Sequence, residues 1–164
     1  MQLNAKTQRL SSIAPLSVIE SDALRLLAFD GVEIALEPQS VLFRQGDAAD
    51  GGYVVISGSV ALEREREVPA PVRLMKSGSL IGLSALIVKL ERPATATARE
   101  KSLLLKLPRR LVLRVLEAFP DSAIALKQYI EDSLAAQANA LERIARSIDA
   151  VAANYSVRES RTGT

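Results

Sequence analysis

The residues with the clearest potential for chemistry in this 164-residue sequence are cations gathered in one segment. Residues 89–114 hold eight basic side chains against Glu91 and Glu100, a local charge of +6. The basic residues are Lys89, Arg92, Arg99, Lys101, Lys106, Arg109, Arg110 and Arg114. Such a segment could form a face for an anion or a nucleic acid. We favour solvated residues that alternate along strands and a helix, because no aromatic residues interleave with them.

Catalytic chemistry has little support. Histidine and cysteine are both absent, which removes the commonest general base, the commonest metal ligand and any thiol nucleophile or disulfide. The hydroxyls of Ser84, Thr95 and Thr97 have no base in evidence, and no pair of carboxylates stands out. We therefore expect no enzymatic activity, no metal site and no cofactor.

Composition indicates one domain with an appendage. The chain is 48% hydrophobic with a net charge of +2, as expected for a globular protein. The first twelve residues lack an apolar signal region, and no stretch approaches the length of a membrane span. We expect a cytoplasmic protein without membrane contact.

An N-terminal helix should position one end of the domain. Residues 16–29 show amphipathic spacing, with Ser17 as the N-cap and Glu20 three residues later as the second half of a capping box. We expect this helix to close over one end of a sheet.

The central part of the chain, residues 32–107, has the period-two pattern of short strands. The alternating runs are residues 32–36, 41–43, 53–56 and 60–62. Turn signals at Gly46, Gly58 and Gly78 separate strands, and such spacing is typical of an antiparallel sandwich or barrel. Residues 63–71 are polar and broken by proline, which predicts an exposed hairpin tip with no assigned function.

Helical periodicity returns after Leu107. Pro108 suits an early helix position, Phe119 and Pro120 should end this helix, and Asp121 or Ser122 should cap a longer one. Apolar residues of the longer helix follow a heptad seam with one polar interruption. The seam residues are Ile130, Leu134, Gln137, Leu141, Ile144, Ile148 and Val151.

This seam has two interpretations. Its first turns can pack on the chain's own sheet, but little of the chain remains to cover it beyond Leu134. We favour a parallel two-stranded contact between two copies, in which Gln137 fixes the register. The predicted divisions are therefore a domain over residues 1–134, a coiled-coil extension over 135–151 and a mobile tail over 152–164.

Four motifs resemble the cyclic-nucleotide-binding domain family, which includes catabolite-activator-type regulators. They are residues 41–47, 53–60, 78–86 and 92–98, within a similarity that spans roughly residues 10–134. The resemblance implies a mainly β fold with flanking helices (α+β): an antiparallel jelly roll, or β-roll, with an N-terminal helix and a long C-terminal dimerisation helix. It also implies a regulatory role.

The same resemblance identifies a phosphate-binding cassette. In the family, a short helix after the cassette glycine directs backbone N–H groups at the cyclic phosphate, and an arginine neutralises its charge. Gly82 and Arg92 occupy these positions. As alternatives, Arg92 is a surface residue or pairs with Glu91. The expected ligand-binding residues are Ile81, Gly82, Leu83, Ser84, Arg92, Pro93 and Ala94.

Two of these residues depart from the family pattern. Leu83 stands where binding members carry a glutamate for the ribose hydroxyl, and Pro93 has no N–H to donate. Each lost hydrogen bond to a charged group is worth roughly 1.5–3 kcal/mol, so affinity should fall on the order of a hundredfold to ten-thousandfold. Leu83 is also expected to fill the pocket with its side chain.

Two functions follow as hypotheses. The first is a dimeric regulatory module that binds a cyclic nucleotide weakly, or another small anion, through the cassette. The second is a ligand-independent dimerisation or protein-docking module that has lost the pocket. Direct DNA binding is not expected, because only a short polar tail follows the long helix where related regulators carry a helix-turn-helix.

Overall fold

The computed structural model describes residues 2–162 of the chain. These divide into two compact units, with the boundary between Leu126 and Lys127. The sequence places the end of the domain later, at residue 134. Within the described residues, no helix combines the length and apolar character that a membrane crossing requires.

The chain begins with helices that the sequence predicts only in part. Helix α1 (Leu3–Ser11) leads through the short 3-10 helix η1 (Leu16–Val18) to α2 (Ser21–Asp30). The predicted single helix over residues 16–29 is therefore wrong in its first turn, and neither Ser17 nor Glu20 makes a side-chain capping bond. The reason is tertiary, because the Glu20 backbone and carboxylate both bond to Ser122 instead.

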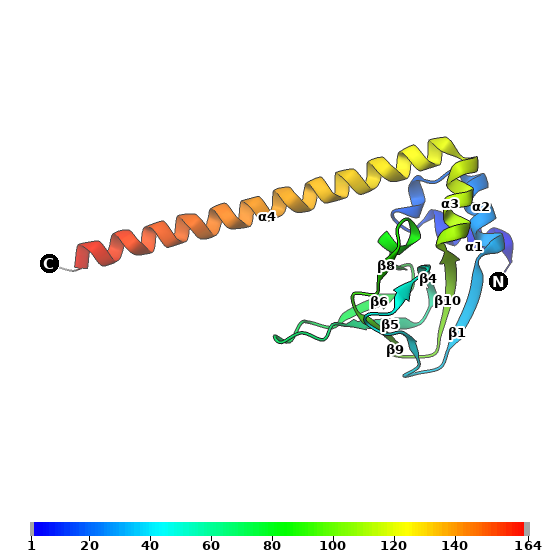
Figure 1. The fold of residues 1–164 in the computed structure, drawn as a ribbon, viewed down its shortest axis with the longest axis horizontal. Helices are drawn as coiled ribbons and strands as arrows, with labels where there is room; N and C mark the ends of the chain where they lie inside the picture. The colour runs from blue at the N-terminus through cyan, green and yellow to red at the C-terminus, as the bar shows by residue number, and fades with distance from the viewer. Residues whose placement is uncertain (1, 163–164) are drawn as a thin grey trace. The chain divides into compact units, whose positions relative to one another are not determined.

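Two four-stranded antiparallel sheets form the central roll (Figure 1). The first sheet has the order β1 (Val32–Leu36), β10 (Ser102–Pro108), β4 (Gly51–Ser57), β7 (Leu80–Ile81). The second has the order β2 (Val41–Phe43), β9 (Thr95–Ala98), β5 (Ser59–Glu63), β6 (Arg73–Lys76). A short ladder joins β3 (Ala48–Ala49) to β8 (Leu90–Glu91). The predicted antiparallel β-roll is confirmed.

The turns between strands also follow the sequence signals. Gly46, Gly58 and Gly78 all have positive φ, between 86° and 88°, a backbone region that glycine enters without steric cost. The predicted hairpin tip is an irregular, mostly exposed segment between β5 and β6 that projects from the roll (Figure 1).

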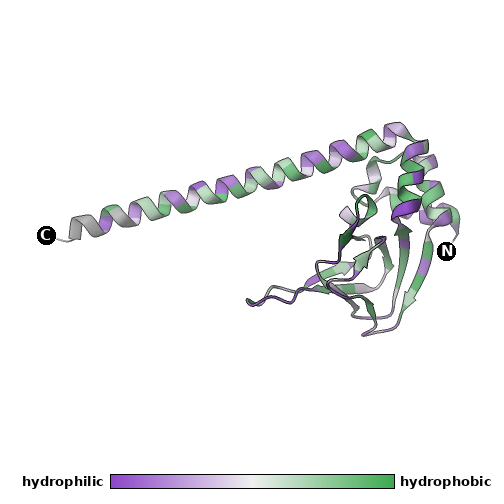
Figure 2. Cartoon of the chain, in the orientation of Figure 1, coloured by the Kyte–Doolittle hydropathy of each residue, from purple (hydrophilic) through white to green (hydrophobic). Residues whose placement is uncertain are grey.

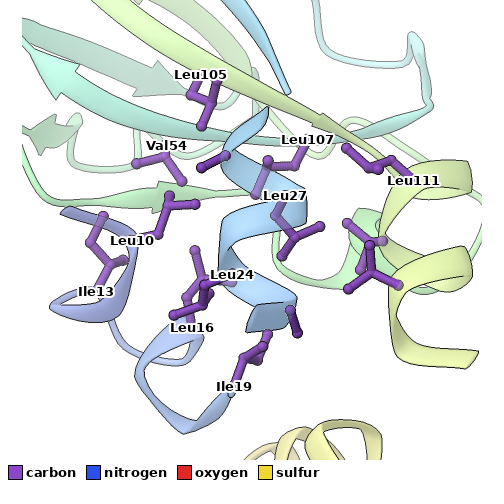
Figure 3. Packing of buried hydrophobic residues seen from close by; sticks show 14 of the residues in the cluster. Leu10, Ile13, Leu16, Ile19, Leu24, Leu27, Val54, Leu105, Leu107 and Leu111 are labelled. Atoms are coloured by element: carbon purple, nitrogen blue, oxygen red, sulfur yellow. The ribbon is translucent and has the colours of Figure 1, made fainter. Parts of the chain in front are cut away.

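Alternate residues of the first sheet face two separate cores. Val54 of β4 and Leu105 of β10 point towards α1, α2 and α3 (Arg109–Ala118), whereas Val55 and Leu104 point into the roll. Figure 3 shows the core on the helical side, where leucines of the helices pack on those of β10. This period-two division is why the strands read as continuous apolar runs.

Helix α3 gives way to α4 (Pro120–Thr162) at Phe119, as the Phe-Pro pair predicts. The predicted capping of α4 by Asp121 or Ser122 is wrong, because the helix already begins at Pro120. Ser122 lies within its first turn, 1% exposed. Its hydroxyl accepts from the Glu20 N–H at 3.0 Å and donates to the Glu20 carboxylate at 2.9 Å.

The second unit is a single helical segment. Apolar and polar residues alternate along it (Figure 2), and the larger apolar residues of the predicted seam are all more than half exposed from Leu134 onwards. Tyr155, 67% exposed, continues the stripe one heptad after Ile148. The helix extends to Thr162, past the predicted boundary at Val151, and residues 163–164 lie outside the described part of the chain.

Candidate functional site

The cassette is built around a left-handed glycine. Gly82 follows β7 with φ +83°, and its carbonyl accepts from the Ala85 N–H at 3.1 Å to start the 3-10 helix η2 (Ser84–Leu86). A Cβ added to Gly82 would lie 2.8 Å from Nη1 of Arg92. Glycine is required here for both reasons, its backbone conformation and the close approach of the guanidinium.

Arg92 is held inside the roll. Its backbone N–H donates to the Asp47 carbonyl at 2.7 Å, and its carbonyl accepts from the Gly46 N–H at 2.8 Å. These two bonds anchor the residue between β8 and β9. The guanidinium donates through Nη2 to the Gly51 carbonyl at 2.7 Å. The residue is only 4% exposed, so the alternative of a surface arginine is wrong.

Two aromatic rings face the Arg92 guanidinium. Its Cζ lies 4.3 Å from the centroid of the Phe43 ring and 5.4 Å from that of Tyr53, within the range of cation–π attraction. The two rings are tilted against each other, with centroids 5.9 Å apart. Both residues occupy positions on β2 and β4 that pack around the roll interior. The sequence prediction of the site does not include Phe43 and Tyr53. The available signal is that both are aromatic residues at positions where the strand pattern directs the side chain into the roll.

The electrostatics of Arg92 are those of a buried cation without a counter-charge in contact. No described carboxylate forms an ion pair with it, Glu91 included, and its Nε has no hydrogen-bond partner. Burial lowers the pKa of the guanidinium from its ordinary value. Electrostatic interactions with Tyr53 and Asp50 act in the opposite direction and raise it. Such a group can offer in-plane N–H donors to an oxyanion.

Leu83 does not fill the roll. It is half-buried and packs against the core on the helical side, together with Leu80 and Ile87. The expectation that its side chain enters the pocket is therefore wrong. The interior near the cassette is occupied instead by Phe43, Tyr53 and the Arg92 side chain itself.

The remaining predicted site residues are divided between interior and surface. Ile81 and Ala94 are buried, at 3% and 7% exposure, whereas Ser84 and Pro93 are exposed. The structure thus brings Gly82 and Arg92 into contact, and it leaves Ser84 and Pro93 at the rim.

Two further cations of the basic segment, Arg99 and Lys106, pair with carboxylates at the surface. Arg99 pairs with Glu63 at 3.2 Å, and Lys106 pairs with Asp50 at 2.8 Å. The Lys106 hydrogen bond is the main reason that the pKa of Asp50 lies below its ordinary value. For these residues the interpretation of a solvated, alternating surface is confirmed.

Comparison with known proteins gives a consistent assignment. The model of the cyclic nucleotide-binding domain matches residues 33–119. A Brucella abortus structure described as a cyclic nucleotide-binding-like protein is 27% identical, with a TM-score of 0.62, and the match covers 69% of this chain and 98% of that one. The N-terminal domain of a transcriptional regulator from Streptomyces coelicolor is 26% identical, with a TM-score of 0.74, over 81% of this chain and 94% of that one.

A curated relative is much longer. The chain is 30% identical over 135 residues to Rap guanine nucleotide exchange factor 1 of Caenorhabditis elegans. The match covers 81% of this chain and 13% of that protein. This likeness therefore concerns one domain of a large protein.

Proposed function

Because this chain belongs to the cyclic nucleotide-binding domain family, we propose that it is a regulatory module that binds a cyclic nucleotide weakly, or another small anion, around Gly82 and Arg92. The family is regulatory rather than catalytic, and we assign this chain no reaction of its own. We further propose that two copies pair through the seam of α4.

The observation that carries the proposal is that the cassette buries a positive charge, that of Arg92, without a carboxylate of the described residues beside it. Arg92 is a buried guanidinium in contact with carbonyl and aromatic groups but with no described carboxylate. Taking a cation out of water is costly unless it is paired. A phosphate or similar oxyanion beside Gly82 would accept charge-assisted hydrogen bonds from the guanidinium and offset that cost.

Two features keep the proposed affinity low. The family resemblance assigns the ribose contact to the position of Leu83, whose aliphatic side chain packs towards the helices and offers no acceptor. Pro93 cannot contribute an N–H. A ligand held mainly by its negative charge is therefore favoured over one recognised through its sugar.

A ligand-independent dimerisation or docking module is the second candidate. The contacts of Arg92 with Phe43, Tyr53 and the Gly51 carbonyl favour it, because they partly satisfy the guanidinium without any anion. The exposed apolar stripe of α4 is compatible with either candidate.

Thermal unfolding with a ligand panel separates the two candidates. Cyclic AMP, cyclic GMP, phosphate and sulfate would each be added at millimolar concentration to the wild type, to Arg92→Ala and to Arg99→Ala. Arg99 is an exposed cation paired with Glu63 and serves as the matched control. We expect at least one anion to raise Tm in the wild type and the control but not in Arg92→Ala.

A flat response across the panel would contradict the sensor and favour the docking module. A shift that persists in Arg92→Ala would place the anion elsewhere on the surface.

Sedimentation tests the proposed dimer separately. Leu141→Asp puts a charge in the predicted seam, whereas Asn139→Asp adds the same side chain on the outer face of the heptad. We expect the first to yield monomers and the second to leave the dimer intact. A wild-type monomer, or a dimer indifferent to Leu141→Asp, would contradict the assignment of the seam.

A further inference from the structure

Part of the basic segment forms a groove whose lining does not include the cassette residues Gly82 and Arg92. The groove has a volume of about 570 Å³ and lies beside the start of α3. Four of its lining residues are cations and one is a carboxylate. The lining residues are Asp50, Lys89, Pro108, Arg109, Arg110, Leu111, Leu113 and Arg114.

The charge of this groove is poorly neutralised by the protein itself. Lys89 and Arg110 are exposed and form no ion pair with any described carboxylate. Arg114 reaches Asp30 only at 3.5 Å, with both side chains open to water. The single carboxylate of the groove, Asp50, already accepts from Lys106 at 2.8 Å.

Arg109 is fixed in the groove by several hydrogen bonds. Its Nη1 donates to the carbonyl of Ala49 at 2.8 Å and to those of Ala85 and Val88 at 3.2 Å. Its backbone N–H donates to the Asp50 carbonyl at 2.7 Å. One side chain thus joins β3, η2 and α3, and because its partners are neutral carbonyls its charge persists.

The surface between these cations is partly apolar. Leu113 is 42% exposed although it lies in the groove, and Pro108 and Leu111 adjoin it. None of the lining residues is aromatic, so the groove offers no platform on which bases could stack. The combination of cations with an exposed leucine matches an acidic segment that carries an apolar side chain.

We propose that this groove docks an acidic, partly apolar segment of a partner protein. Carboxylates of the segment pair with Lys89, Arg110 and Arg114, and an apolar side chain packs on Leu113. The proposal does not require the cassette to hold a ligand. It does place the partner against Arg109. Because Arg109 donates to the Ala85 carbonyl of the cassette helix η2, the docking groove and the cassette are in direct contact through this residue.

Fluorescence anisotropy with a labelled twelve-residue peptide of repeated Glu-Glu-Leu tests the proposal on the full chain. The wild type should bind the peptide, and the affinity should fall as salt is raised. The triple variant Lys89→Glu, Arg110→Glu, Arg114→Glu should bind at least about tenfold more weakly. The matched control reverses three exposed cations elsewhere, Arg66→Glu, Arg73→Glu and Lys101→Glu, and should retain most of the binding.

Circular dichroism would verify that the triple variant is folded. If it is not, Lys89→Gln with Arg110→Gln replaces it, and a loss of about threefold to tenfold is expected. Single-stranded DNA of twelve nucleotides and vesicles of anionic phospholipid serve as competing probes. The proposal is overturned if the peptide does not bind, if the control loses as much affinity as the groove variant, or if DNA or vesicles bind through the same cations more tightly than the peptide.

Discussion

The two faces of the β1-β10-β4-β7 sheet are built from the same strands but are filled differently. On the helical side, Val54 and Leu105 join a hydrophobic core with residues of α1, α2 and α3. On the roll side, Val55 and Leu104 share the interior with aromatic rings and the buried charge of Arg92. The side chains that the sheet buries on the helical face are uncharged, whereas the roll face also packs around a buried guanidinium.

The largest expected effect lies on the helical face. Leu105 is fully buried, so Leu105→Ala should lower the free energy of unfolding by about 2–5 kcal/mol in urea denaturation. Any anion-dependent rise in Tm should survive in this variant, because the residue faces away from Arg92. If a folded Leu105→Ala protein no longer responded to the anion, the conclusion that the two faces of the sheet act independently would be contradicted.

A backbone change on the roll face should have the next largest effect. Gly82→Ala forces a positive φ on alanine, at a cost of roughly 1–3 kcal/mol, and its Cβ would displace the Arg92 guanidinium. Gly46→Ala is the matched control, since it has a similar φ of +88° but no atom within 4 Å of the added Cβ. We expect Gly82→Ala to be the less stable of the two by chemical denaturation. Equal losses would mean that the guanidinium moves aside freely.

Removal of the charge itself should matter less. Arg92→Met keeps an unbranched apolar side chain near the Phe43 ring but abolishes the buried cation. We expect the free energy of unfolding to change by less than about 1.5 kcal/mol in either direction, because buried charges are often replaced by apolar groups without loss. A loss well above about 3 kcal/mol would make Arg92 a structural residue and remove the contrast between the faces.

The smallest effect should come from the ion pair at the edge of the roll. The folded-state pKa of Asp50 is lowered, chiefly by the Lys106 hydrogen bond, so the pair stabilises the fold above the ordinary pKa of 3.8. This stabilisation is lost as the pH falls through the lower folded-state value. Asp50→Asn should remove this part of the acid dependence and cost only about 0.2–1 kcal/mol at neutral pH. Unfolding measured between pH 7 and pH 2 tests both points.

The sequence predicts the roll well because period-two runs and turn glycines are local signals. It predicts the positions of Gly82 and Arg92 because they lie in matched motifs. It cannot predict that Leu83 packs towards the helices, that Phe43 and Tyr53 face Arg92, or that Lys89 and Arg114 line one groove, since these depend on which distant segments become neighbours. The misplaced start of α2 has the same origin, because a long-range bond to Ser122 replaces the local capping box.

The pair formed by Glu20 and Ser122 also bears on how related sequences should differ. The serine hydroxyl is used in both directions, it is 1% exposed, and it lies 102 positions from its partner. Replacing Ser122 with alanine would remove the acceptor of the Glu20 backbone N–H, a donor that any residue except proline keeps at position 20. Across an alignment of relatives we therefore expect position 122 to keep a side chain that accepts a hydrogen bond, even where the residue at position 20 and the cassette differ.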